Sequence, residues 1–254
     1  MSSDYDLERK KFDRVASAIV VEPLSKTNLE RYASPRWPNL FPKEKMFSLA
    51  GDVRGKKILE LGCGDGVEAL QLAYCGADVT GLDLSEVSIS VARQRASLQG
   101  FQINFRVDNI VENGSLGEES FDVVWCNLIL HHVVDGLELV MPKIVQALKP
   151  GGMFISREPV AYARWLKALR GLVPVGSDTD DPNQQPFRDS EFLIVRKYFP
   201  DLCMRHYRIL ARADLITTNL SIIRMLARAD NLLLLVPGSA ALAGDIVMWA
   251  RKKQ

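Results

Sequence analysis

The sequence predicts an α/β fold built on a doubly wound, largely parallel sheet. Short apolar segments alternate with helix-type segments from residue 56 to residue 159, which is typical of right-handed βαβ units. The strand candidates are apolar along their whole length, as expected where helices cover both faces of a sheet. The first of them runs into the three glycines of LELGCGDG at residues 59–66, and such a turn is typical of a ligand-binding sheet edge.

The first half of this α/β region begins with the strand KKILELG at 56–62, an apolar run closed by glycine. A helix over 66–73 and a second strand, DVTGLDLS at 78–85, follow it. Ser85 is a favourable N-cap residue, so we expect the next helix to run from there to about Gln99.

The second half continues with a third strand, INFRVDN at 103–109, and a longer fourth strand, FDVVWCNLIL at 121–130. The next helix covers 137–148. Its regular part is expected to begin near Pro142, because proline is tolerated in the first turn of a helix. The fifth strand is MFISREP at 153–159.

The segments on either side of this region are less regular. Residues 1–55 hold a candidate helix over 5–21 followed by four prolines, so we assign them to an N-terminal helical or lid segment. Residues 56–254 form the main domain, with a helical cap insertion at about 160–190 that includes the polar loop GSDTDDPNQQP.

The C-terminal part of the main domain should contain further helices and strands. A helix is expected over 189–199, with Asp189 or Ser190 as its N-cap. The remaining candidates are a strand at 204–210, a mostly helical stretch at 215–235 and a strand at 246–251.

Composition excludes several classes of protein. The chain has 254 residues and a net charge of +1, so we expect neither a nucleic-acid partner nor a membrane partner. Its four cysteines form no C-x-x-C pair, which predicts no metal site and no disulfide framework. The polar N-terminus and the lack of a long apolar run predict a cytoplasmic protein. Oligomeric state has no signal in the sequence.

The spacing of the glycines narrows the kind of ligand. Gly62 and Gly64 could begin the dinucleotide pattern G-x-G-x-x-G, but its third position falls on Val67. No Gly-Lys-Ser/Thr follows, which excludes a P-loop. Asp83 ends the second strand, where a carboxylate can accept hydrogen bonds from a ribose diol, and Asp108 ends the third strand. These residues predict a nucleotide-type binding loop.

The linked motifs ILELGCGDG, GLDLS, VDN, FDVVWCNLILHH and LKPGG resemble the class I S-adenosylmethionine-dependent methyltransferases, in the same order. The resemblance covers about residues 56–158, and a linked series is more specific than one glycine loop. It implies a Rossmann-like sheet of seven strands with a reversed last hairpin, and S-adenosyl-L-methionine as the cofactor.

The resemblance also implies a role for each motif. The turn after the first strand would hold the methionine part of the cofactor, and the end of the second strand would hold its ribose. The end of the third strand would contact its adenine, and the end of the fourth strand would line its sulfonium side. A carboxylate at Glu60 is favourable beside the cofactor's ammonium group. The implied cofactor-binding residues are, in that order, Glu60, Gly62, Cys63 and Gly64, then Asp83 and Leu84, then Asp108 and Asn109, then Asn127 and Leu128.

Two further positions are candidates for catalysis, because they follow strands at the expected active-site edge. His131 and His132 come directly after the fourth strand, and a histidine can remove a proton from an acceptor. We expect His131 to lie nearer the pocket, although a structural role for the pair fits equally well. Glu158 ends the fifth strand and is a candidate base or substrate anchor, or else a residue that closes the turn.

The predicted function is methyl transfer to a small, fairly apolar molecule, because the cap insertion is rich in apolar residues. Tyr162 and Trp165 in this insertion are candidate substrate-binding residues. Oxygen, nitrogen and carbon all stay open as the methylated atom. Two alternatives also stay open: an enzyme of another reaction type on this fold, such as a cyclase, and a non-catalytic cofactor-binding protein.

Overall fold

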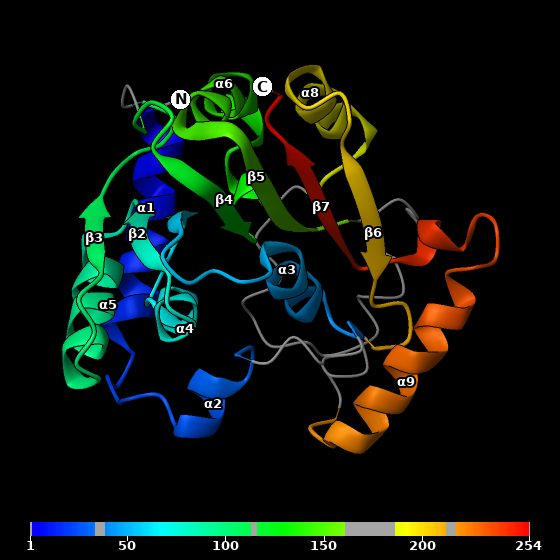
Figure 1. The fold of residues 1–254 in the computed structure, drawn as a ribbon, viewed down its shortest axis with the longest axis horizontal. Coiled ribbons are helices and arrows are strands. Elements are labelled where there is room, and N and C mark those ends of the chain that lie inside the picture. The colour runs from blue at the N-terminus through cyan, green and yellow to red at the C-terminus, as the bar shows by residue number, and fades with distance from the viewer. Residues whose placement is uncertain (1, 34–38, 113–115, 161–185, 212–216, 254) are drawn as a thin grey trace.

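The computed structural model describes residues 2–33, 39–112, 116–160, 186–211 and 217–253. The strands within these residues are β1 Lys57–Leu61, β2 Asp78–Asp83, β3 Asn104–Val107, β4 Phe121–Asn127, β5 Leu148–Pro159, β6 Cys203–Tyr207 and β7 Asp245–Arg251. They form one sheet in the order β3-β2-β1-β4-β5-β7-β6, in which β7 runs opposite to the others (Figure 1). The predicted doubly wound sheet with its reversed last hairpin is confirmed.

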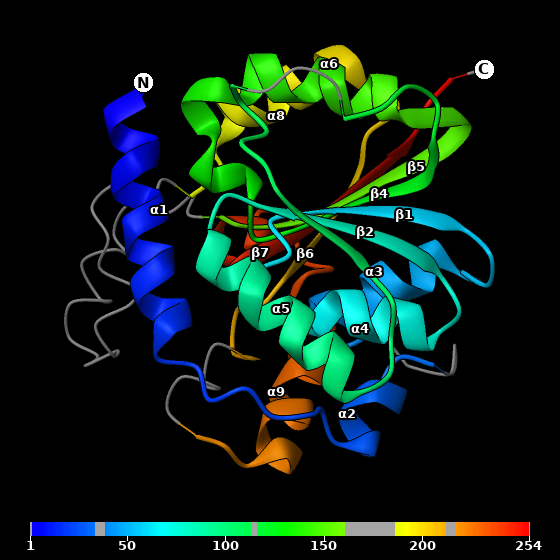
Figure 2. The same cartoon turned by 90° about the vertical axis from the view of Figure 1, so that its left-hand side faces the viewer.

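Helices cover both faces of this sheet. Those in the described part of the chain are α1 Ser2–Ser17, α2 Lys26–Glu30, α3 Pro42–Ala50, α4 Val67–Tyr74, α5 Glu86–Leu98, α6 Leu137–Ala147, α8 Asp189–Tyr198 and α9 Leu220–Leu233. Figure 2 shows α3, α4 and α5 on one face, and α6 and α8 on the other. α1 packs against α5. None of the described helices is long and apolar enough to cross a bilayer.

The central strands bury both of their faces, which explains their continuously apolar sequences. In β1, Leu59 and Leu61 belong to the core under α6, whereas Ile58 belongs to the core under α4 and α5. Because side chains alternate along a strand, Glu60 lies on the same face as Ile58 and is buried there. This alternation brings a carboxylate into the layer between the sheet and α4.

α6 runs from Leu137 to Ala147 without a break, so the predicted start near Pro142 is wrong. Pro142 has no N–H to donate to the Glu138 carbonyl one turn earlier. That carbonyl accepts a hydrogen bond from the Tyr198 hydroxyl of α8 at 3.3 Å instead. A bond between two helices thus replaces the one missing inside α6, and the proline is tolerated in the helix interior.

Local pairing moves two other boundaries away from their predicted places. β5 begins at Leu148, ahead of the two glycines, because this stretch already pairs with β4 across an irregular register. The N-cap of α8 is Arg188 rather than Asp189 or Ser190. The Glu191 carboxylate accepts the Arg188 N–H at 2.6 Å, so the first turn of α8 is closed one residue earlier than expected.

The N-terminal segment contains more helix than its prolines suggest. Pro42 stands at the start of α3, where a helix needs no N–H from that residue. α3 contacts β5 and β7, so part of residues 1–55 packs on the sheet. The domain division at residue 55 stays a prediction, and residues 161–185 of the predicted cap lie outside the described residues.

A buried carboxylate fixes α9 to the end of β6. Asp230 of α9 accepts hydrogen bonds from the N–H groups of Ile209, Leu210 and Ala211 at 2.7–3.1 Å. These residues follow β6, which ends at the carboxyl edge of the sheet. α9 is therefore held at that edge.

Replacing Asp230 with alanine should destabilise the protein by roughly 2–4 kcal/mol, because a cluster of backbone N–H groups loses its acceptor. Equilibrium unfolding in urea measures the loss. Asn219→Ala is the matched control in the same helix: Asn219 caps α9, accepting the N–H groups of Ser221 and Ile222, and its loss should cost about 1 kcal/mol. Equal losses in the two variants would contradict the anchoring role of Asp230.

Candidate functional site

A cavity opens at the carboxyl edge of the sheet, around the turn that follows β1. Its walls come from this turn, from the ends of β2 and β3, from the segment after β4 and from α1. It encloses about 740 Å³ of space between protein atoms, part of which is open solvent.

The turn after β1 presents bare backbone to the cavity. Gly62, Gly64 and Gly66 all have positive φ angles, of 68°, 51° and 78°. A Cβ on Gly62 would lie 2.7 Å from Ile129, and one on Gly66 would lie 2.8 Å from Ala92, so these two glycines permit close packing. A Cβ on Gly64 would meet no atom within 4 Å. Gly64 therefore leaves an open surface on which a ligand can contact the main chain.

Asp83 ties the ends of neighbouring strands together. Its Oδ2 accepts the Gly64 N–H at 2.8 Å, its Oδ1 accepts the Ser85 N–H at 2.9 Å, and its carbonyl accepts the Asp108 N–H at 2.9 Å. Burial raises the pKa of the Asp83 carboxyl, and the two N–H donors act in the opposite direction. The carboxylate lines the cavity and keeps acceptor capacity for a ligand hydroxyl.

The end of β3 forms the next part of the wall. Asp108 and Asn109 both line the cavity. Asn109 uses its side-chain oxygen to accept the N–H groups of Val111 and Glu112 at 3.0 and 3.3 Å. The side chain of Asn109 thus shapes the turn, and the contact of its backbone with the adenine stays a prediction.

α1 supplies a wall that the motifs do not indicate. Tyr5, Glu8 and Phe12 line the cavity, and their spacing of three and four residues places them on one face of the helix. Glu8 pairs with His132 Nδ1 at 2.5 Å, and the Phe12 ring meets the His132 ring edge-on with centroids 5.3 Å apart. The sequence analysis named none of these three residues, and only their helical spacing could have indicated them.

His131 and Glu158 form a buried pair behind this wall. Glu158 is fully buried, and its Oε2 lies 2.8 Å from His131 Nδ1. The carboxylate also accepts the N–H groups of Leu130 and His131, at 3.0 and 3.2 Å, and the Ser156 hydroxyl at 2.9 Å. Glu158 therefore holds the short 3-10 turn at Leu130–His132 that follows β4.

The two histidines lie in the reverse of the expected order. His132 lines the described cavity and His131 does not, although their ring centroids are only 4.0 Å apart. The reason is the Glu158 carboxylate, which draws the His131 ring toward β5. The expectation that His131 lies nearer the pocket is wrong for this cavity.

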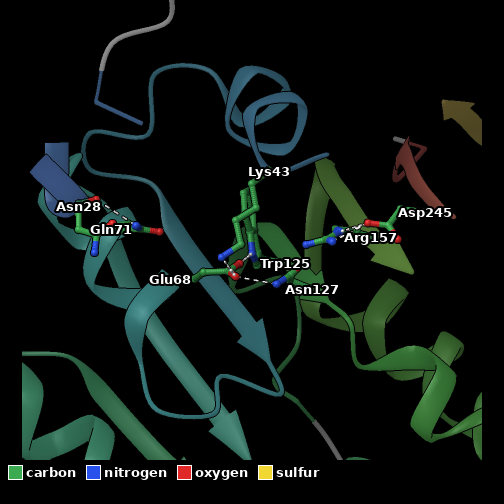
Figure 3. A network of polar contacts seen from close by, with 8 residues as sticks. All are labelled: Asn28, Lys43, Glu68, Gln71, Trp125, Asn127, Arg157 and Asp245. Carbon is green, nitrogen blue, oxygen red and sulfur yellow. Dashed lines mark hydrogen bonds and ion pairs between the residues drawn. The ribbon is translucent and has the colours of Figure 1, made fainter. Parts of the chain in front are cut away.

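A polar network lies on the α4 side of the same edge (Figure 3). The Glu68 carboxylate accepts hydrogen bonds from Trp125 Nε1 at 2.9 Å and Asn127 Nδ2 at 2.6 Å, and pairs with Lys43 Nζ at 2.6 Å. Lys43 comes from α3, Glu68 from α4 and the other two from β4. The network joins the N-terminal segment to the centre of the sheet.

Glu60 is buried beside this network. Its Oε2 has no hydrogen-bond partner among the described residues. Burial raises the pKa of Glu60 well above its usual value, the charge of Glu68 adds to the rise, and Lys43 opposes it. A buried carboxyl oxygen without a donor is costly, so the geometry calls for a cationic or hydrogen-bonding group from a ligand.

A second charged cluster lies farther along the edge, and Figure 3 shows its main pair, Arg157 and Asp245. Asp245 Oδ2 accepts Arg157 Nε and Nη2 at 3.0 and 2.5 Å, and Arg208 Nη1 lies 3.4 Å from the same oxygen. The sequence analysis missed this cluster, because its members come from strands far apart in the chain.

Most of the predicted cofactor-binding residues line the cavity; these are Gly62, Gly64, Asp83, Leu84, Asp108, Asn109 and Leu128. Three do not. Glu60 is buried beneath the edge, and the Asn127 side chain turns to Glu68. The Cys63 thiol packs over Gly81, and burial raises its pKa well above the usual value, so it is an inert space-filler. The predicted substrate-binding Tyr162 and Trp165 lie outside the described residues.

Comparison with protein families decides what kind of domain carries this site. A family model described as a methyltransferase domain matches residues 52–185, about half of the chain. The chain belongs to this methyltransferase family. The match spans the glycine turn and the strand ends that line the cavity, which agrees with the resemblance seen in the motifs.

Curated relatives of this chain include enzymes named ubiquinone biosynthesis O-methyltransferase. That of Escherichia fergusonii is 36% identical over 135 residues, which cover 50% of this chain and 56% of the relative. That of Hydrogenovibrio crunogenus is 33% identical over 141 residues, covering 53% and 58%. The chain thus matches little more than half the length of these relatives.

Solved structures with the same fold are more distant in sequence. Phosphoethanolamine N-methyltransferase 2 of Haemonchus contortus, in complex with S-adenosyl-L-methionine, superimposes with a TM-score of 0.57 at 20% identity, over 89% of this chain and 56% of that chain. A putative methyltransferase of Bacillus halodurans gives 0.55 at 18% identity, over 86% and 100%. At these identities the likeness supports the fold alone.

The buried carboxyl of Glu60 should make stability depend on pH. Because its folded pKa is raised, the folded protein keeps a proton that the unfolded chain releases, and stability is lost as the pH rises through that window. Glu60→Gln carries no such proton. We expect equal stability below the ordinary glutamate pKa, and a variant more stable than the wild type by more than about 1 kcal/mol at neutral pH.

Urea unfolding at several pH values measures this effect, and Asp122→Asn is a control of opposite sign. Burial acts to raise the pKa of Asp122, but hydrogen bonds from Lys149 and the Lys57 N–H outweigh this effect and lower the pKa. The ionised Asp122 therefore stabilises the fold above the ordinary aspartate pKa, and its variant should lose stability there. A Glu60→Gln variant that is less stable than wild type at neutral pH would contradict the assignment.

Proposed function

We propose that this protein binds S-adenosyl-L-methionine in the described cavity and transfers a methyl group to a small-molecule acceptor. The observation that carries the proposal is the buried Glu60 Oε2, which has no partner among the described residues and belongs to β1, the strand that leads into the glycine turn lining the cavity. A ligand with a cationic group at one end and a nucleoside at the other complements these features.

The residues present fit this cofactor. Glu60 would pair with the ammonium of its methionine part, which would keep the carboxylate ionised despite its burial. The open face of Gly64 would contact the same part. Asp83 would accept hydrogen bonds from the ribose hydroxyls, and Asp108 with the backbone of Asn109 would meet the adenine.

When bound, the cofactor supplies a methyl group on a positively charged sulfur. The protein's contribution is then alignment and the exclusion of water. α1 covers part of the cavity through Tyr5 and Phe12. The pairing of Glu8 with His132 holds α1 against the segment that follows β4.

An acceptor hydroxyl also needs a group that takes its proton. We keep His131 for this role, although it lies beside the wall of the described cavity and not in it, with its ring centroid 4.0 Å from that of His132. Its Nδ1 is held by Glu158, so Nε2 is the ring nitrogen left to accept a proton. Glu158 is fully buried and engaged by the turn after β4, so we assign it as a positioning residue that orients His131.

Oxygen is the acceptor atom that we favour. Both curated relatives described above carry O-methyltransferase in their names, and their similarity covers about half of this chain. The acceptor itself is a small molecule, which the predicted apolar cap would cover.

Calorimetric titration with S-adenosyl-L-methionine and S-adenosylhomocysteine tests the cofactor site. Wild type should bind both, and Asp83→Asn should weaken binding by about tenfold to a hundredfold, because a charge-assisted acceptor is lost. Asp122→Asn is the control: it lies at the opposite edge of the sheet, paired with Lys149, and should bind as wild type does. Wild-type protein that binds neither compound would contradict the proposal.

Release of S-adenosylhomocysteine from a panel of phenols, catechols, amines and carboxylic acids tests the reaction. We expect turnover with hydroxyl acceptors. Glu158→Gln should lower kcat and move its pH profile while cofactor affinity is kept, since the residue acts through His131. A protein that binds the cofactor and methylates no member of the panel would favour a non-catalytic role.

A further inference from the structure

The outward face of α9 is unusually apolar for a helix at the edge of a protein. Among its exposed side chains are Met225 and Leu232, which are 59% and 70% exposed, and Leu235 just beyond the end of the helix is 78% exposed. Leu220, Ile222 and Val236 are also exposed. Of the large apolar side chains found exposed in the described residues, many fall in this one stretch. The inward face needs only Ile223, Ala227 and Asp230 to seat the helix. The exposed apolar stripe is therefore not required for folding.

The charges around this stripe have one sign. Arg224 and Arg228, one helical turn apart, are exposed and have no ion-pair partner in the described part of the chain. Asp230 is the acidic residue of α9, and it is turned inward to bind the N–H groups that follow β6. The outward face thus combines apolar side chains with arginines and carries no acid.

We propose that α9 docks the protein on an anionic lipid surface. An amphipathic helix lies in a membrane interface when its apolar side chains enter the acyl boundary and its basic side chains meet anionic headgroups. Arg224 and Arg228 flank the stripe, so they are placed to contact phosphates while Met225 and Leu232 insert. A soluble protein partner would need acidic residues at positions that match these two arginines. An anionic lipid surface carries negative charge across its whole area, so it needs no such match.

The position of α9 in the fold gives the docking a direction. Figure 1 shows α9 at the outer side of the molecule, beyond β6, the last strand of the sheet. Asp230 ties it to the carboxyl edge, the same edge that carries the cavity. Docking through α9 brings this edge toward the bilayer, where a fairly apolar acceptor would concentrate. The docking itself does not depend on the proposed reaction.

Flotation of the full-length protein with lipid vesicles tests the proposal. Wild type should float with vesicles of phosphatidylglycerol and phosphatidylcholine in equal parts, and not with phosphatidylcholine alone. The double variant Met225→Ser/Leu232→Ser should bind the anionic vesicles at least about tenfold more weakly. Arg224→Gln/Arg228→Gln should weaken binding by about fivefold for each arginine and reduce its dependence on salt.

Leu193→Ser is the matched control, because Leu193 is exposed to a similar degree but lies on α8, which covers the other face of the sheet (Figure 2). It should float as wild type does, and thermal unfolding should confirm that every variant is folded. Wild type that fails to bind anionic vesicles, or α9 variants that bind them as well as wild type, would overturn the proposal. A dimer in sedimentation velocity that the Met225→Ser/Leu232→Ser variant abolishes, without vesicle binding, would show that the stripe joins two copies instead.

Discussion

The hydrogen bond from the Gly64 N–H to the Asp83 carboxylate is the contact on which the binding edge depends. It draws the turn after β1 against the end of β2, while the Asp83 carbonyl binds the Asp108 N–H at the end of β3. One residue thereby fixes the relative positions of three strand ends. Gly64 can donate this hydrogen bond because it adopts a positive φ angle. Since it has no side chain, the space above it stays open.

Buried carboxylates organise the rest of the edge in two different ways. Glu158 and Glu68 are satisfied by the protein itself, through backbone N–H groups, a hydroxyl, an indole and an amide. Glu60 lies in the same layer as Glu68, between the sheet and α4, and has an oxygen that no described group satisfies. This contrast distinguishes the structural carboxylates from one that is available to a ligand. A buried charge without a partner destabilises the fold, and a hydrophobic residue at the same position would be more favourable.

The fold and the cofactor edge were predictable from the sequence because they rest on local patterns. Apolar strands and the glycine turn place Asp83 and Asp108 at one edge by topology alone. The Glu8–His132 pair and the Arg157–Asp245 pair were not predictable, since each joins elements far apart in the chain. The start of α6 was predicted wrongly from Pro142, because the hydroxyl that replaces the missing hydrogen bond belongs to Tyr198 on another helix. The net charge of the whole chain likewise gives no indication of the positively charged outward face of α9.

α1 has a consequence for how the cavity exchanges its contents. The helix forms part of the cavity wall, and its polar contacts with the rest of the domain include the Glu8–His132 pair and the Asp13–Ser85 hydrogen bond at 2.6 Å. A ligand seated in the cavity gains contacts with Tyr5 and Phe12, and by thermodynamic reciprocity it stabilises the docked helix by the same free energy. Occupancy of the site and protection of the α1 amides from solvent exchange are thus two measures of one equilibrium.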